Sequence, residues 1–241
     1  FGNKLMAGKK GLKDLELVLV DLKDVAVNTN KKEAASIGIP QSAAITCVKP
    51  SGTVSQLVGV SSGMHPWHND YYIRTVRGDK KDPLTQFLKD SGIPAEDDFM
   101  KPQDTTVFSF PMKAPSGAIL RNELTATEHL DTWLVYQRAW CEHKPSITVS
   151  VREEEWMEVG AWVYKHFDEL SGISFLPYSD HTYKQAPYQD CSKEEYDAFV
   201  KRMPENINWE ALSLYELEDS TTGSQALACV AGECEIVDIN P

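Results

Sequence analysis

The sequence predicts an α/β fold, in which helices alternate along the chain with short apolar strands. Apolar residues recur every three or four positions in the longer segments, as in amphipathic helices, and short β-branched runs separate these segments. The chain has 241 residues, of which 41% are hydrophobic, so it can bury a sizeable core. Because helices separate the strands, we expect mostly parallel strand pairing.

The first expected element is a long helix over residues 12–37, which Gly38 ends and Pro40 follows. Further helices are expected over 83–89, 127–142 and 153–170. Another begins at Ser192, where Glu195 gives the spacing of a capping box. The expected strands are residues 43–48, 71–76, 105–110, 146–151 and 173–176.

No repeat, low-complexity stretch or linker divides the first 215 residues, so we expect one domain over residues 1–217. Beyond it the sequence becomes polar and rich in turn formers, which predicts a mobile C-terminal tail over 218–241. The sequence opens at Phe1 with neither an initiator Met nor a signal peptide. We therefore expect a piece of a longer polypeptide.

Charge and cysteine content exclude several classes of protein. The chain has 24 basic and 36 acidic residues, a net charge of −12, and lacks the basic stripe that nucleic-acid polymers require. No run approaches the roughly 20 apolar residues of a membrane span. The five cysteines are an odd number, which favours a reduced, cytoplasmic compartment. Cys47 lies in an apolar run and is expected to be buried.

A glycine-containing turn is the first candidate site, and it follows the expected strand 43–48. Its glycine lets the backbone approach a ligand closely, its hydroxyls can donate hydrogen bonds, and a helix start there would favour an anion. The spacing is not that of a Walker motif, and an ordinary capped turn is the alternative. The candidate phosphate-binding residues are Lys49, Ser51, Gly52, Thr53, Val54 and Ser55.

The second candidate is the pair Cys229 and Cys234 in the expected tail. The 13 residues from Glu216 to Ala228 span at most about 43 Å when extended, so a dithiol on this tether could reach a distant site. A structural disulfide or half of a metal site are the alternatives. A zinc site needs two more ligands, and no histidine follows His181, so we expect no metal.

Two histidine-containing segments are less informative. His65 and His68 flank Pro66 and are expected to be hydrogen-bonded or solvent-exposed loop residues rather than ligands. The sequence Cys141-Glu142-His143 places a thiol near a base. Adjacent residues at a helix end point in different directions, so a structural role is expected.

Several motifs together resemble the adenosylcobalamin-dependent (class II) ribonucleotide reductases. The similarity is greatest to the monomeric branch that reduces ribonucleoside triphosphates. It covers nearly the whole chain. The motifs, in order, are residues 46–55, 60–65, 71–74, 146–151, 172–177 and 185–188, followed by the cysteine pair.

This resemblance implies the C-terminal part of a ten-stranded α/β barrel with a flexible tail. It also implies that the turn Lys49–Ser55 holds the phosphates of a ribonucleoside triphosphate and that adenosylcobalamin is the cofactor. Cys229 and Cys234 would re-reduce an active-site disulfide and be restored in turn by a thioredoxin-like protein.

The chain lacks the cysteine motif that the family uses to start its radical chemistry. That step needs a cysteine followed two positions later by a carboxylate, and no Cys-x-Glu occurs in this sequence. We therefore expect the chain to be inactive without the N-terminal portion of the enzyme, and we assign no residue to the corrin. The alternatives are a non-catalytic nucleotide-binding module and a thiol–disulfide exchange protein.

Overall fold

A computed structural model describes residues 8–51, 54–178 and 184–216 of the chain. Their contacts divide them into two compact units, each assembled from two stretches of sequence. The first unit contains residues 8–67 and 115–178, and the second contains residues 68–114 and 184–216. Both units combine helices with strands, which confirms the mixed helix-and-sheet class.

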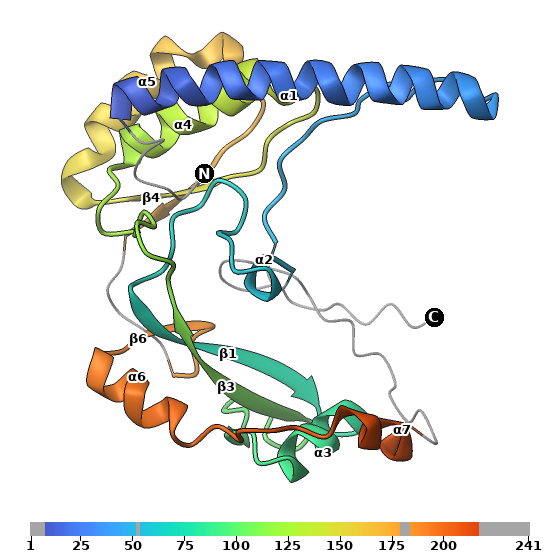
Figure 1. The fold of residues 1–241 in the computed structure, drawn as a ribbon. Coiled ribbons are helices and arrows are strands. Elements are labelled where there is room, and N and C mark those ends of the chain that lie inside the picture. The colour runs from blue at the N-terminus through green and yellow to red at the C-terminus, as the bar shows by residue number, and fades with distance from the viewer. Residues whose placement is uncertain (1–7, 52–53, 179–183, 217–241) are drawn as a thin grey trace, which may run out of the picture. The chain divides into compact units, whose positions relative to one another are not determined.

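The first unit is mainly helical, and α1, α4 and α5 pack together beside β4 (Figure 1). Strands β4 and β5 pair in parallel, with Thr148 opposite Ser174. Its elements are α1 (Gly8–Ile37), α2 (Val54–Leu57), α4 (Ala126–Ala139), β4 (Thr148–Val151), η2 (Glu153–Glu155), α5 (Trp156–Lys165), η3 (Phe167–Glu169) and β5 (Ser174–Pro177). The most buried core side chains include Met64, Leu130, Trp133, Val149 and Val151.

Helix α1 ends where the sequence predicts. Gly38 has a φ of +73°, a left-handed conformation that glycine adopts without steric cost. The amide of Ile39 donates to the carbonyl of Ala34 at 3.0 Å, which closes a Schellman-type cap.

The second unit is built on a four-stranded antiparallel sheet in the order β2-β3-β1-β6. Its two long strands pair from Tyr71 opposite Lys113 to Asp79 opposite Thr105. The elements are β1 (Tyr71–Asp79), α3 (Pro83–Asp90), β2 (Ala95–Asp97), β3 (Thr105–Lys113), β6 (Tyr188–Asp190), α6 (Lys193–Val200), η4 (Trp209–Ala211) and α7 (Leu212–Tyr215). The predicted capping box at Ser192 is confirmed at the start of α6.

The expectation of mostly parallel pairing is wrong, because three of the four strand pairings in the described residues are antiparallel. Residue periodicity reports which face of a strand is buried. It does not report the direction of the neighbouring strand.

The segment 43–48 is not a strand, and this prediction is also wrong. Its backbone is hydrogen-bonded to the turn that follows α4: Glu142 N–H donates to Thr46 O at 2.8 Å and Ser146 N–H to Val48 O at 3.0 Å. These bonds join an extended segment to an irregular turn, so no ladder forms. Cys47 is exposed rather than buried, because this segment lies at the edge of the unit.

Candidate functional site

The predicted phosphate turn begins at Lys49, whose side chain is exposed, and continues into α2. Two of its serines are bonded to each other. The Ser55 amide donates to Ser51 Oγ at 3.0 Å, and Ser55 Oγ donates to Ser51 O at 2.8 Å. Ser55 is only 4% exposed. Its hydroxyl therefore closes the turn, rather than pointing toward solvent as a donor to a ligand. Gly52 and Thr53 lie outside the described residues.

A second loop, residues 61–65, supports this turn from one side. The Ser51 amide donates to Ser62 Oγ at 3.0 Å. Gly63 has a φ of +58°, and a Cβ placed there would lie 3.3 Å from the carbonyl oxygen of Lys49. Glycine is thus required both by the backbone conformation and by the close approach of the two loops. We call residues 61–65 the support loop.

Two histidines hold the support loop against the rest of the unit. His65 Nδ1 lies 2.8 Å from Ser62 O, and His65 Nε2 accepts from the Thr148 amide at 3.0 Å. His129 Nε2 lies 3.0 Å from the carbonyl oxygen of Met64. The rings of His65 and His129 meet edge to face, with 5.7 Å between their centroids.

These partners define the protonation of both rings. Only a proton on Nδ1 lets His65 donate to Ser62 O while Nε2 accepts from Thr148, so His65 is neutral. Burial lowers the pKa of His65, and the bond to Ser62 opposes the shift. Burial lowers the pKa of His129 to about 3, with a further contribution from His65. Neither ring carries charge at neutral pH.

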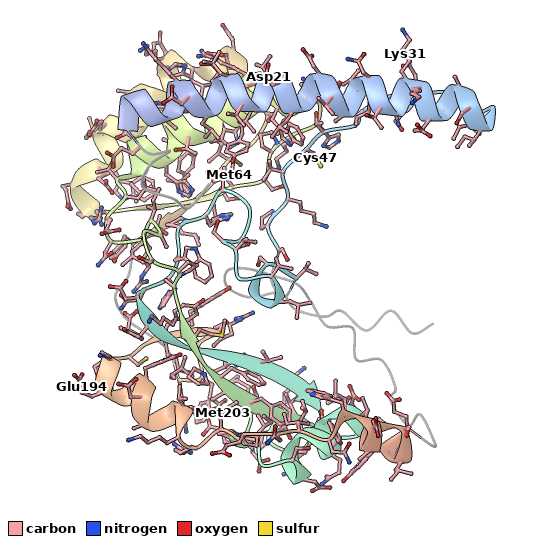
Figure 2. All side chains as sticks on the ribbon, viewed as in Figure 1. Asp21, Lys31, Cys47, Met64, Glu194 and Met203 are labelled. Carbon is pink, nitrogen blue, oxygen red and sulfur yellow. The ribbon has the colours of Figure 1, made fainter. Side chains whose placement is uncertain are left out.

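Figure 2 places Met64 and Cys47 on the same side of α1. Met64 is fully buried, whereas Cys47 is exposed. The support loop therefore inserts the Met64 side chain into the core, while Ser62 stays bonded to the turn and to His65. The prediction that His65 is a hydrogen-bonded loop residue is confirmed. His129 was missed, since one histidine among the apolar positions of a helix gives no distinctive signal.

The thiol of Cys141 is not activated as a nucleophile. Burial raises the pKa of Cys141 to about 11, so its thiol is protonated at neutral pH. The Glu142 carboxylate accepts from the Ile45 amide at 2.6 Å, which gives Glu142 a structural role. Cys229 and Cys234 lie outside the described residues.

A surface groove of about 370 Å³ runs along α4 and α5, and none of its lining residues is a predicted site residue. Its polar groups are bonded to one another or to neighbours: Trp162 Nε1 donates to Asp131 Oδ1 at 2.8 Å, and His166 Nδ1 lies 3.1 Å from Glu169 Oε1. The lining residues are Thr127, Asp131, Glu158, Ala161, Trp162, Lys165 and His166. We do not assign this groove to a phosphorylated substrate, because the carboxylates of Asp131 and Glu158 line it beside its one lysine, Lys165.

Residues 8–51, 54–178 and 184–216 contain neither a metal-binding cluster nor a membrane-spanning helix. No group of three or more side chains there is placed to hold a metal ion. No helix in that part of the chain combines the length and apolarity of a membrane span.

Comparison with known proteins decides the family. The adenosylcobalamin-dependent ribonucleoside-triphosphate reductase of Levilactobacillus brevis is 32% identical over 191 residues, 77% of this chain and 25% of that protein. The Euglena gracilis enzyme of the same name is 29% identical over 201 residues, 83% of this chain and 28% of that protein. A probable enzyme of this kind from Dictyostelium discoideum is 30% identical over 235 residues, 92% of this chain and 30% of that protein.

A solved structure agrees with these sequences. The crystal structure of a B12-dependent (class II) ribonucleotide reductase superposes with a TM-score of 0.72 at 27% identity, covering 87% of this chain and 29% of that one. This chain is a relative of the class II ribonucleotide reductases. No family model matches it. It spans between a quarter and a third of the length of these reductases.

The names of these reductases imply a cobalamin, and the described residues do not by themselves fit one. The α4–α5 groove is open and lined by mutually bonded polar groups. The half-buried His65 and the buried His129 have their ring nitrogens committed to backbone groups, apart from His129 Nδ1.

Proposed function

We propose that the chain is the C-terminal portion of an adenosylcobalamin-dependent ribonucleoside-triphosphate reductase, which converts ribonucleotides to 2′-deoxyribonucleotides. The observation that carries this proposal is the similarity over 77–92% of the chain to reductases of that name. The reaction would need the remaining portion of the enzyme, which supplies the radical cysteine. A cytoplasmic location suits an enzyme whose working thiols must be kept reduced.

Within this enzyme, the turn Lys49–Ser55 would hold the substrate phosphates. Lys49 offers an exposed cation, and Gly52 offers a residue without a Cβ, so that the backbone can approach an anion. The reciprocal bonds between Ser51 and Ser55 support this role indirectly. They hold the ends of the turn together before the ligand arrives, which reduces the entropy lost on binding.

Cys229 and Cys234 would supply electrons to the reductase. In each turnover an active-site dithiol is oxidised to a disulfide while the ribose loses its 2′-hydroxyl as water. A thiolate of the pair attacks that disulfide, forms a mixed disulfide and releases one active-site thiol. The second thiol of the pair then displaces the other, leaving Cys229 and Cys234 oxidised. A thioredoxin-like dithiol reduces them by the same exchange.

Replacing Gly52 with valine tests the phosphate turn. A branched side chain at this position should block close approach of the backbone and weaken triphosphate binding about tenfold to a hundredfold, the cost of one or more charge-assisted hydrogen bonds. The measurement is equilibrium binding of a ribonucleoside triphosphate to the complete polypeptide that carries these residues.

Gly160→Val is the matched control, because the site of its Cβ is open space on α5 and its backbone has no left-handed strain. Its affinity should equal that of the unmodified protein. Equal affinity in a folded Gly52→Val protein would refute the assignment of the phosphate turn.

A further inference from the structure

We propose that His65 is a positioning residue for the phosphate turn, which it holds in place through Ser62. This inference rests on the proposed function of the turn Lys49–Ser55, and it assigns a role to a side chain that would not itself touch the substrate.

The connection is a continuous series of hydrogen bonds. The Ser51 amide donates to Ser62 Oγ at 3.0 Å, His65 Nδ1 bonds Ser62 O at 2.8 Å, and the Thr148 amide donates to His65 Nε2 at 3.0 Å. Ser62 is thus held by its hydroxyl at the turn and by its carbonyl at His65. The series begins inside the proposed site and ends at the first residue of β4.

The end of the series at β4 is rigid. Val149 and Val151 are almost fully buried, and β4 is paired along its length with β5. The neighbouring bond from His129 to Met64 O fixes the same loop to α4. The position of the turn is therefore set by the packed core of the first unit, rather than by the turn's own sequence.

Histidine suits this role because one ring must donate on one side and accept on the other. Neutral imidazole offers both, at a fixed separation and in one plane. Phenylalanine fills a similar volume but offers neither bond. Glutamine retains a single acceptor near the Nε2 position and loses the donor to Ser62. Both substitutions therefore break the bond to Ser62, and only phenylalanine also breaks the bond to Thr148.

The consequence is a defect in binding. Without the His65 ring, the Ser62 carbonyl keeps only its bond from the backbone amide of residue 65, and the link from Ser62 through the ring to Thr148 is lost. The support loop can then shift relative to Lys49, while every group proposed to touch phosphate remains present. We expect His65→Phe to weaken ribonucleoside-triphosphate binding about three- to tenfold, the net value of one or two hydrogen bonds. Hydrogen exchange at the Ser51 amide should accelerate in the same variant.

A double-mutant cycle on the complete polypeptide tests whether His65 acts through Ser62. Ser62→Ala removes the acceptor of the Ser51 amide, and the double variant carries both changes. If the two residues act in series, the affinity of the double variant for the ribonucleoside triphosphate equals that of whichever single variant has the lower affinity. If instead the fold losses of affinity in the two single variants multiply in the double variant, the residues act independently and the proposal is overturned.

The controls separate this inference from the proposed function. His143→Phe changes an exposed histidine of the same unit and should leave the affinity unchanged. Weak binding by Gly52→Val together with normal binding by His65→Phe would overturn the positioning role alone. Normal binding by both would refute the phosphate turn itself. Should His65→Phe fail to fold, His65→Gln decides the question by the same two measurements.

Discussion

At the scale of single residues, burial rather than chemical type decides how the histidines behave. His129 is 5% exposed and has a pKa lowered to about 3, far below its ordinary value near 6.5. Its neutral ring donates to the Met64 carbonyl, and a proton added to the second nitrogen would charge the core. This residue therefore acts as a structural donor and does not serve as an acid or base.

The lowered pKa predicts how stability depends on pH. Between pH 6.5 and about 3 the unfolded state binds a proton at His129 that the folded state does not, so stability falls as pH falls through this range. The contribution is fully present above about pH 6.5, and the slope approaches about 1.4 kcal/mol per pH unit. His65 acts in the same direction, because its pKa is also lowered.

The stability can be followed by hydrogen exchange of the β4 amides between pH 7 and pH 5. After correction for the intrinsic exchange rate, the exchange rates give the free energy of opening at each pH. His129→Gln is the comparison, since its amide can donate to Met64 O and does not titrate. The unmodified protein should lose stability more steeply than this variant. Identical slopes would show that His129 does not drive the effect.

At the scale of elements, each unit contains a helix that begins with a complete capping box. In α4, Thr125 Oγ1 accepts from the Glu128 amide at 3.2 Å and Glu128 Oε2 accepts from the Thr125 amide at 3.0 Å. A carboxylate from elsewhere in the unit adds to this helix start, because Glu155 Oε1 accepts from the Ala126 amide at 3.0 Å. Glu155 therefore stabilises the start of α4 although it lies in η2, 29 positions later in the chain.

Removing the cap should destabilise α4 measurably. Thr125→Ala leaves the Glu128 amide without its side-chain partner and should cost about 1 kcal/mol. Denaturant unfolding followed through the near-ultraviolet signal of the buried Trp133 would report the loss. Thr29→Ala, an exposed position within α1, is the control and should be neutral or slightly stabilising. A loss equal to that of the control would exclude the cap as a stabilising feature.

In helix α1, several apolar residues that fit the helical pattern are exposed and do not belong to the core. Leu15 and Leu19 are buried as expected, but Val18, Leu22 and Val25 of the same pattern are 44%, 51% and 64% exposed. In Figure 1 the later part of α1 runs past α4 and α5. The apolar pattern specifies the helix correctly, whereas the neighbours available in the fold decide which of its residues are covered.

At the scale of the whole molecule, the proposed reductase would depend on electron transfer through Cys229 and Cys234. Replacing both with serine in the complete enzyme should abolish repeated turnover with a thioredoxin system while sparing a single turnover, because an already reduced active site needs no exchange. The amount of deoxyribonucleotide formed per enzyme, measured over time, distinguishes the two cases. A small dithiol that reaches the active site should restore turnover.

Cys191→Ser provides the control, as Cys191 is a half-buried free thiol outside the proposed exchange. Its turnover with thioredoxin should be normal. Persistent repeated turnover in the double-serine variant would eliminate the shuttle role of the pair.

Much of the local structure could be predicted from the sequence. The end of α1 at Gly38, the cap at Ser192 and the long strands β1 and β3 follow from the preferences of a few neighbouring residues. The motifs around Lys49–Ser55 likewise indicated the family that the comparisons support. Such features are local, so a short stretch of sequence contains the information needed to specify them.

Only the tertiary structure decided the direction of strand pairing, the exposure of Cys47 and the partners of the two histidines. His65 meets the amide of Thr148, which lies 83 positions later in the chain. Hydrogen bonding and burial over such separations depend on how packed elements bring distant segments together. That information is shared among all the residues of the core and cannot be read from the neighbours of His65.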